Sequence, residues 1–159
     1  MKVHHNQELP YANSPEEKRR EAEIFSKHYY TRDTLEWWIS HPYRRHTLRH
    51  LTRYLRVRSD LFRDNCRVIE PACGCGVNLT NLAKDFPHYE YFGLDLSLQG
   101  VRVASTWGGG CYAVGDAEDI PFGGETFDIC LCIAAIHHFH RNPTRFLGEM
   151  CRVVKRNGV

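Results

Sequence analysis

The chain has 159 residues, of which 42% are hydrophobic and 25% are charged, with a formal net charge of +2. This is the composition of one ordinary globular domain and excludes a disordered or fibrous protein. No apolar run approaches the ~20 residues of a membrane span. The first ten residues, MKVHHNQELP, lack the hydrophobic segment of a secretory signal. We therefore expect a cytoplasmic protein without membrane contact.

The seven cysteines are an odd number for a disulfide framework, and they fall in segments that resemble strands and turns. We expect free thiols in a reducing compartment. Two C-x-C pairs, Cys73/Cys75 and Cys130/Cys132, raise the alternative of a four-thiolate metal site. Their spacing differs from the usual C-x-x-C, and the second pair lies in an apolar run. The sequence therefore predicts core and loop cysteines, and no metal.

The first 60 residues are predicted to form a helical cap or lid. Ser14-Pro15-Glu16-Glu17 combines an N-cap, a first-turn proline and a capping box, and the helix it begins should end near Tyr30. A second, short helix is predicted over residues 33–39, where His41-Pro42 interrupts the pattern.

A third helix is predicted from Tyr43 to Arg58, with leucines on one face. Its other faces hold six arginines and no acidic residue between Arg44 and Arg58. One interpretation is a surface for phosphate or tRNA. The other is the solvated side of an amphipathic helix that covers a sheet, and the sequence favours this second interpretation.

Residues 67–76, RVIEPACGCG, indicate a buried strand, a tight small-residue turn and the start of a helix. Such a turn places free backbone N–H groups and a strand-end carboxylate in the crevice where open α/β sheets bind ligands. A dinucleotide fingerprint would require a third glycine. Val77 or Leu79 occupies that position, which argues against an NAD-dependent oxidoreductase.

Later segments repeat the strand-and-helix pattern, so residues 61–159 are predicted to form a Rossmann-like α/β domain with a parallel sheet. We expect strands at 89–94, 111–114 and 126–133, with helices at 98–107 and from Pro143 onwards. The first two of these strands end beside Asp95 and Asp116. The fourth strand is nearly continuously apolar, as expected of an interior strand.

Four motifs in this order resemble the class I S-adenosylmethionine-dependent methyltransferases: EPACGCG, GLDLS, GDAEDIPF and FDICLCIAAIHHF. The resemblance covers roughly residues 60–159. Ala72 stands where the family's first motif usually has glycine. The family sheet has seven strands and this chain supplies about four, so we expect a fragment of a longer protein. Its fourth strand should then present an uncovered edge.

The resemblance implies that S-adenosylmethionine is the cofactor and that particular residues bind it. Asp95 would accept from the ribose hydroxyls and Asp116 from the adenine amino group, while Ala117 would offer a backbone N–H. From the residues alone, Asp95 could instead simply cap the helix that begins near Ser97. The predicted cofactor-binding residues are Glu70, Ala72, Gly74, Gly76, Asp95, Leu96, Asp116, Ala117 and Ile133.

Methyl transfer from a sulfonium mainly requires positioning of the reactants, and a base only where the acceptor must lose a proton. His137 and His138 are the candidate bases, because they follow the fourth strand and titrate near neutral pH. Neighbouring side chains on a helix point in different directions, so at most one should face the pocket. The alternative is that one is packed and the other exposed.

Three functions remain open. A methyltransferase acting on a small-molecule acceptor is expected first. A tRNA methyltransferase of the wobble-uridine type is the second, because IAAIHHF resembles that group and the Arg44–Arg58 helix is basic. The third is a non-catalytic remnant that binds the methyl donor. The oligomeric state is not predicted.

Overall fold

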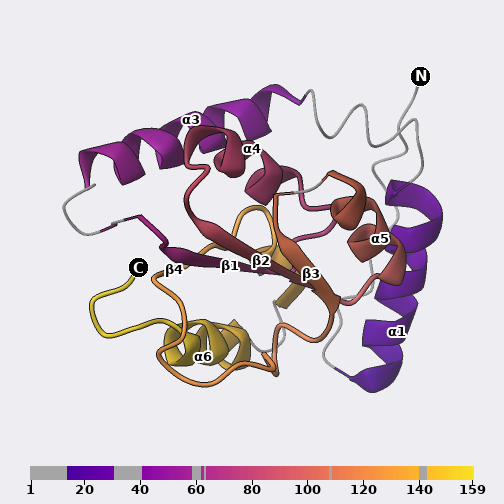
Figure 1. Ribbon diagram of the computed structural model, residues 1–159. Coiled ribbons are helices and arrows are strands. Elements are labelled where there is room, and N and C mark those ends of the chain that lie inside the picture. Colours follow the sequence, from indigo (N-terminus) through magenta and orange to yellow (C-terminus); the bar gives the residue numbers. More distant parts are fainter. Residues whose placement is uncertain (1–13, 31–40, 59–61, 63, 108, 140–142) are drawn as a thin grey trace.

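The computed structural model describes residues 14–30, 41–58, 62, 64–107, 109–139 and 143–159. Its centre is a parallel sheet of four strands, ordered β3-β2-β1-β4 (Figure 1). The strands are β1 (Arg67–Pro71), β2 (Glu90–Asp95), β3 (Cys111–Val114) and β4 (Ile129–Cys130). This confirms the predicted α/β class, since β1 is central and the chain crosses over between neighbouring strands.

Successive residues of β1 point to opposite faces of the sheet and thereby build two separate cores. Val68 packs with Leu79 and Leu82 in one core, whereas Ile69 packs with Phe127 in the other. All four of β1's last residues are buried, as expected for a central strand covered on both faces.

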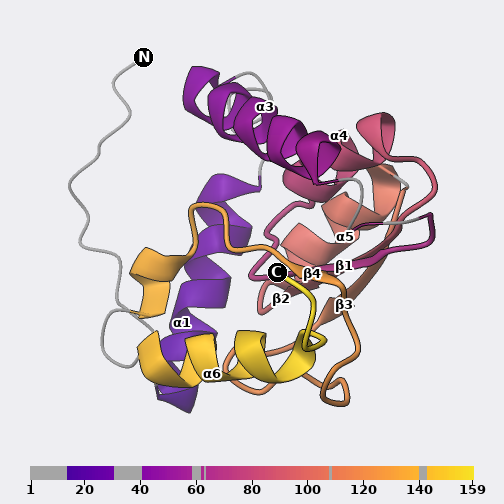
Figure 2. The ribbon, with the colours of Figure 1, turned by 90° about the vertical axis from the view of Figure 1, so that its left-hand side faces the viewer.

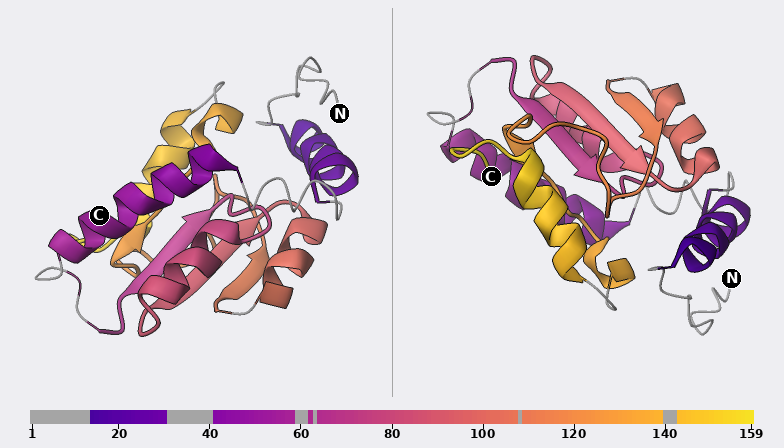
Figure 3. Two further views of the ribbon diagram at one scale, coloured as in Figure 1. Left: turned by 90° about the horizontal axis from the view of Figure 1, so that it is seen from above. Right: turned by 90° about the horizontal axis from the view of Figure 1, so that it is seen from below.

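Helices cover both faces of this sheet (Figures 1 and 3). One face carries α3 (Pro42–Val57), α4 (Val77–Asp85) and α5 (Leu98–Trp107), and the other carries α6 (Pro143–Val153). A short 3-10 helix, η2 (Ile136–Phe139), precedes α6. None of the described helices is long and apolar enough to cross a membrane.

The α1 helix (Pro15–Ile24) stands beside the end of the sheet to which the strand arrows point (Figure 1). Its capping box is confirmed: Glu17 N–H donates to Ser14 Oγ over 3.1 Å, and Ser14 N–H donates to Glu17 Oε2 over 3.0 Å. The chain continues as one π-helical turn, η1 (Phe25–Tyr29), so the predicted single helix changes its winding at Phe25. The helix predicted at 33–39 lies outside the described residues.

Two predictions about the fourth strand were wrong. It extends over Ile129–Cys130 and not over 126–133, because only these residues pair with Val68 and Ile69 of β1. Its outer edge is not bare either. Val159 N–H donates to Asp128 O over 3.0 Å, and Cys130 N–H donates to Val159 O over 2.7 Å. The final residues of the chain thus pair with backbone groups that an interior strand would otherwise present to solvent.

Candidate functional site

The tight glycine turn that was predicted after β1 is present, and its backbone is left-handed at three residues. Ala72, Gly74 and Gly76 have φ values of 60°, 57° and 71°. A Cβ on Gly76 would lie only 2.7 Å from the Cβ of Ala104, so this position needs glycine for space as well as for φ. Cys73 N–H donates to Leu94 O over 2.9 Å and fixes the turn against β2.

Asp95, at the end of β2, joins the turn to the next helix. Its Oδ2 accepts from Gly74 N–H over 2.7 Å, and its Oδ1 accepts from Ser97 N–H over 2.8 Å. Burial raises the pKa of Asp95, although these two N–H groups favour its charged form. The capping alternative was wrong: α5 begins at Leu98, and its cap is Ser97, whose Oγ accepts from Gly100 N–H over 3.1 Å, whereas Asp95 only closes a turn onto Ser97. A carboxylate has about four acceptor positions, so ribose binding by the same side chain stays a prediction.

Glu70 lies beneath the turn and is 1% exposed. Its Oε1 accepts from Asn78 Nδ2 over 2.5 Å, which ties the end of β1 to the first turn of α4. Asn78 was not predicted as a contact of Glu70, because an amide on a helix is usually solvated. Glu70 thus has a structural contact besides its predicted role toward the cofactor.

At the end of β3, two carboxylates meet one lysine from the other end of the chain. Lys18 Nζ lies 2.5 Å from Asp116 Oδ2 and also contacts Glu118 Oε2. Burial lowers the pKa of Lys18, but the two carboxylates outweigh it and the net pKa is raised. Glu118, which is 2% exposed, was not predicted as a site residue, because nothing in the acidic run 116–119 indicates which acid turns inward.

The remaining predicted cofactor residues follow the same strand ends. Leu96 is half-buried directly after Asp95, and Ile133 is half-buried after β4. Ala117 is buried against Phe139 and the neighbouring aromatic ring of α6. The structure therefore brings every predicted cofactor-binding residue to the carboxyl edge of the sheet.

Both histidines of the predicted base pair lie in η2, with ring centroids 4.0 Å apart. His138 Nδ1 lies 2.7 Å from Glu21 Oε1, although the two atoms are not aligned as in a hydrogen bond. The His137 ring is more exposed. Burial, followed by the charge of His138, lowers the pKa of His137. The two side chains thus have different surroundings, and Glu21 was not foreseen from the sequence.

The N-terminal helical turns lie at this edge, and in Figure 2 α1 stands upright to one side of the strands. Ser26 Oγ is 2.8 Å from Ser97 Oγ. Tyr30 packs against the glycine turn: a Cβ on Gly74 would lie 2.8 Å from its hydroxyl oxygen, and one on Gly100 would lie 2.9 Å from its ring. Together with Lys18, these residues place α1 and η1 over the turn, β2 and β3. That they act as a lid stays a proposal.

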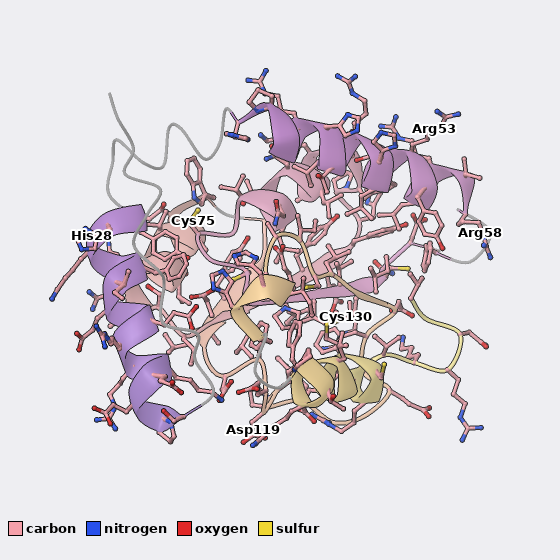
Figure 4. The ribbon with its side chains drawn as sticks, turned by 180° about the vertical axis from the view of Figure 1, so that it is seen from behind. His28, Arg53, Arg58, Cys75, Asp119 and Cys130 are labelled. Carbon is pink, nitrogen blue, oxygen red and sulfur yellow. The ribbon has the colours of Figure 1, made fainter. Side chains whose placement is uncertain are left out.

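All seven cysteines are free thiols. Burial raises the pKa of Cys73 well above its ordinary value and that of Cys130 to about 12, which opposes the thiolate form that metals bind. Within the described ranges, no three potential ligands gather around a common point. Cys66, Cys73 and Cys75 are buried, Cys130 and Cys132 are half-buried, and Cys111 and Cys151 are exposed (Figure 4 labels Cys75 and Cys130).

Comparison with known proteins relates this site to one family. Residues 69–159 match the profile of the methyltransferase domain family. A phthiotriol/phenolphthiotriol dimycocerosates methyltransferase of Mycobacterium leprae is 32% identical over 112 residues, which are 69% of this chain and 41% of that protein. A fatty-acid O-methyltransferase of Mycolicibacterium smegmatis is 36% identical over 95 residues, which are 58% of this chain and 34% of that protein. The chain thus spans less than half the length of these relatives.

Solved structures show the same relationship. The YcgJ protein of Bacillus subtilis is 30% identical with a TM-score of 0.56, covering 69% of this chain and 48% of that one. The PH0226 protein of Pyrococcus horikoshii is 28% identical with a TM-score of 0.60, and the match covers 76% of this chain and 57% of that one. Because the family profile matches more than half of the sequence, over the strands that carry the predicted site, this chain belongs to the methyltransferase domain family.

Proposed function

We propose that the chain forms the donor-binding part of an S-adenosylmethionine-dependent methyltransferase. The observation that carries this proposal is the carboxyl edge, where the left-handed glycine turn donates to Asp95 at the end of β2 and Asp116 follows the neighbouring strand β3. Backbone N–H groups and two acids at successive strand ends fit a nucleoside with a charged amino-acid tail. Asp95 would hold the ribose hydroxyls, Asp116 the adenine amino group, and the turn from Ala72 to Gly76 the tail.

The proposed acceptor is an oxygen on a lipid-like small molecule. Two relatives support this choice, since one is named for fatty-acid O-methylation and the other for dimycocerosates. The names of these relatives give no support to the tRNA alternative. Most of the acceptor pocket would come from parts of a longer protein, since the chain matches only 41% of the M. leprae relative.

When bound, S-adenosylmethionine supplies a methyl group on a positively charged sulfur. The protein's residues would hold an acceptor oxygen in line with that methyl and exclude water. If the acceptor is a hydroxyl, its proton must leave as the new C–O bond forms. His138, whose Nδ1 lies beside the Glu21 carboxylate, would take this proton, and Glu21 would stabilise the resulting imidazolium. A carboxylate acceptor would need no base.

The test is calorimetric titration of the chain with S-adenosylmethionine, comparing Asp95→Asn with Asp119→Asn. Asp119 is exposed at the same edge and provides a matched control (Figure 4). We expect binding by the wild type and the control, and at least a tenfold loss in Asp95→Asn. Because Asp95 also holds the turn, thermal unfolding must show that the variant remains folded. Equal binding by all three proteins would contradict the proposed ribose contact.

An assay of methyl transfer distinguishes an active methyltransferase from a non-catalytic remnant that only binds S-adenosylmethionine. The longer protein would be assayed with radiolabelled S-adenosylmethionine and a fatty acid or long-chain alcohol. Transfer of label to the lipid supports the enzyme, whereas donor binding without transfer to any lipid acceptor favours the remnant.

A further inference from the structure

The α3 helix carries a basic face that the proposed donor site does not use. Arg45, Arg49, Arg53 and Arg56 follow one another at intervals of four, four and three residues, so they line one side of the helix. No acidic residue occurs between Pro42 and Val57. In Figure 4, Arg53 lies on the outer side of α3, away from the sheet, and Arg58 lies at the helix end.

Most of this charge is not neutralised by the rest of the fold. Arg56 Nη2 lies 2.9 Å from Asp85 Oδ1 of α4, an exposed pair. By contrast, Arg45, Arg49 and Arg53 are exposed and form no ion pair with any residue that the structure describes. The leucines alone suffice to hold the helix on the sheet, and a stripe of one sign on its outer side attracts ligands of opposite charge.

A groove of about 860 Å³ runs between α3 and α4 along the same side. The four arginines and Lys84 line it, and Asp85 is its one acidic residue. Five cations against one carboxylate around a single groove suit phosphate groups, which guanidinium ions bind with two parallel hydrogen bonds.

Two exposed apolar side chains stand beside the arginines. Val57 is 72% exposed and Tyr54 is 43% exposed, both in the last turn of α3. Contact with the charged backbone of a nucleic acid would not bury the apolar surface of Val57, so it would add little binding free energy. Entry into the headgroup region of a bilayer would bury that surface, and a tyrosine is also stable there with its ring in the apolar part and its hydroxyl in water. This pairing of cations with exposed apolar groups favours a lipid surface over RNA.

We propose that the basic face of α3, defined by Arg45, Arg49, Arg53 and Arg56, docks the protein on a membrane surface rich in anionic phospholipid. The guanidinium groups bind lipid phosphates, and Val57 and Tyr54 enter the headgroup layer. The leucines of α3 remain in the protein core, so the contact is peripheral. The proposal departs from the expectation, drawn from the sequence, of a protein without membrane contact. This inference does not rest on the proposed function, because it uses no residue of the donor site.

The test is co-sedimentation with vesicles of phosphatidylcholine, alone or mixed with phosphatidylglycerol. The triple variant Arg45→Gln, Arg49→Gln, Arg53→Gln is compared with Arg19→Gln, Arg20→Gln, Arg102→Gln, which removes equal charge from exposed positions on α1 and α5. Each basic residue near an anionic surface contributes about fivefold in affinity. We therefore expect a loss of about a hundredfold for the α3 variant and a smaller loss for the control.

A third variant tests the apolar part of the contact, and three outcomes would overturn the proposal. Val57→Asn should weaken binding to mixed vesicles severalfold without changing its salt dependence. Equal losses in the two triple variants would mean nonspecific charge attraction and overturn the proposal. Absence of vesicle binding by the folded wild type would overturn it as well. If a gel shift then showed retention of transfer RNA that the α3 variant loses, the face would be a nucleic-acid surface. Circular dichroism confirms the fold of each variant.

Discussion

Lys18 and Asp116 are 98 residues apart in the sequence, yet their side chains meet at 2.5 Å over the carboxyl edge of the sheet. The lysine also contacts Glu118, so a single cation from α1 balances two acids that follow β3. Asp116 is the residue proposed to recognise adenine. The contact therefore links the position of α1 to Asp116, the side chain that would bind the adenine of S-adenosylmethionine.

Lys18→Met should lower the free energy of unfolding by about 3 kcal/mol, because Glu118 would remain buried without a partner. Chemical denaturation of the folded chain measures this. Lys27→Met is the matched control, since Lys27 is exposed on η1 and should change stability little. Equal effects of both substitutions would show that the contact contributes nothing specific.

Ala72→Gly should stabilise the protein by up to about 1 kcal/mol. Ala72 has a φ of 60°, a conformation that costs an L-residue with a Cβ about 1–2 kcal/mol, and glycine's greater freedom when unfolded offsets part of the gain. Urea denaturation gives the difference. Ala22→Gly, in the regular helix α1, should instead destabilise by about 1 kcal/mol. If both substitutions lowered the free energy of unfolding, the inference that the backbone at Ala72 is strained would be contradicted.

Stability should depend on the protonation of His137. Its folded-state pKa is lowered below 6.5 by burial and by His138, so folding favours the neutral ring. The contribution is fully present above pH 6.5 and is lost as the pH falls through the folded-state pKa. Melting temperatures of His137→Gln should therefore decline less on acidification than those of the wild type. His88→Gln, at an exposed position, should follow the wild type.

Arg152→Lys should destabilise the protein by about 1–2 kcal/mol. Arg152 Nη1 donates to Phe122 O over 2.7 Å and Nη2 donates to Ile120 O over 2.8 Å, which fastens the segment after β3 to α6. A lysine keeps the charge but lacks the planar fork that makes both bonds. Thermal unfolding compares it with Arg156→Lys, whose side chain is 89% exposed. A larger loss at Arg156 would refute the assignment.

The sequence by itself determined the features that depend on neighbouring residues. Gly74 and Gly76 predicted the tight turn, and Ser14 and Glu17 predicted the first capping box, because backbone conformation and capping are set within a few positions. The apolar pair Val68-Ile69 likewise predicted that β1 is a buried strand. The spacing from Glu70 to Asp95 placed two acids at adjacent strand ends, since one strand-helix-strand unit has a limited range of lengths.

Tertiary structure decided which distant side chains meet. No local pattern distinguishes Lys18 from its neighbouring arginines, or Glu118 from Asp119, because their roles arise only when α1 packs across the edge. The same packing brings Glu21 to His138. The length of β4 was mispredicted for a related reason. Apolar residues at 131–133 are compatible with a buried strand and with a buried loop. The strand ends at Cys130 because the residues after it are not paired with β1.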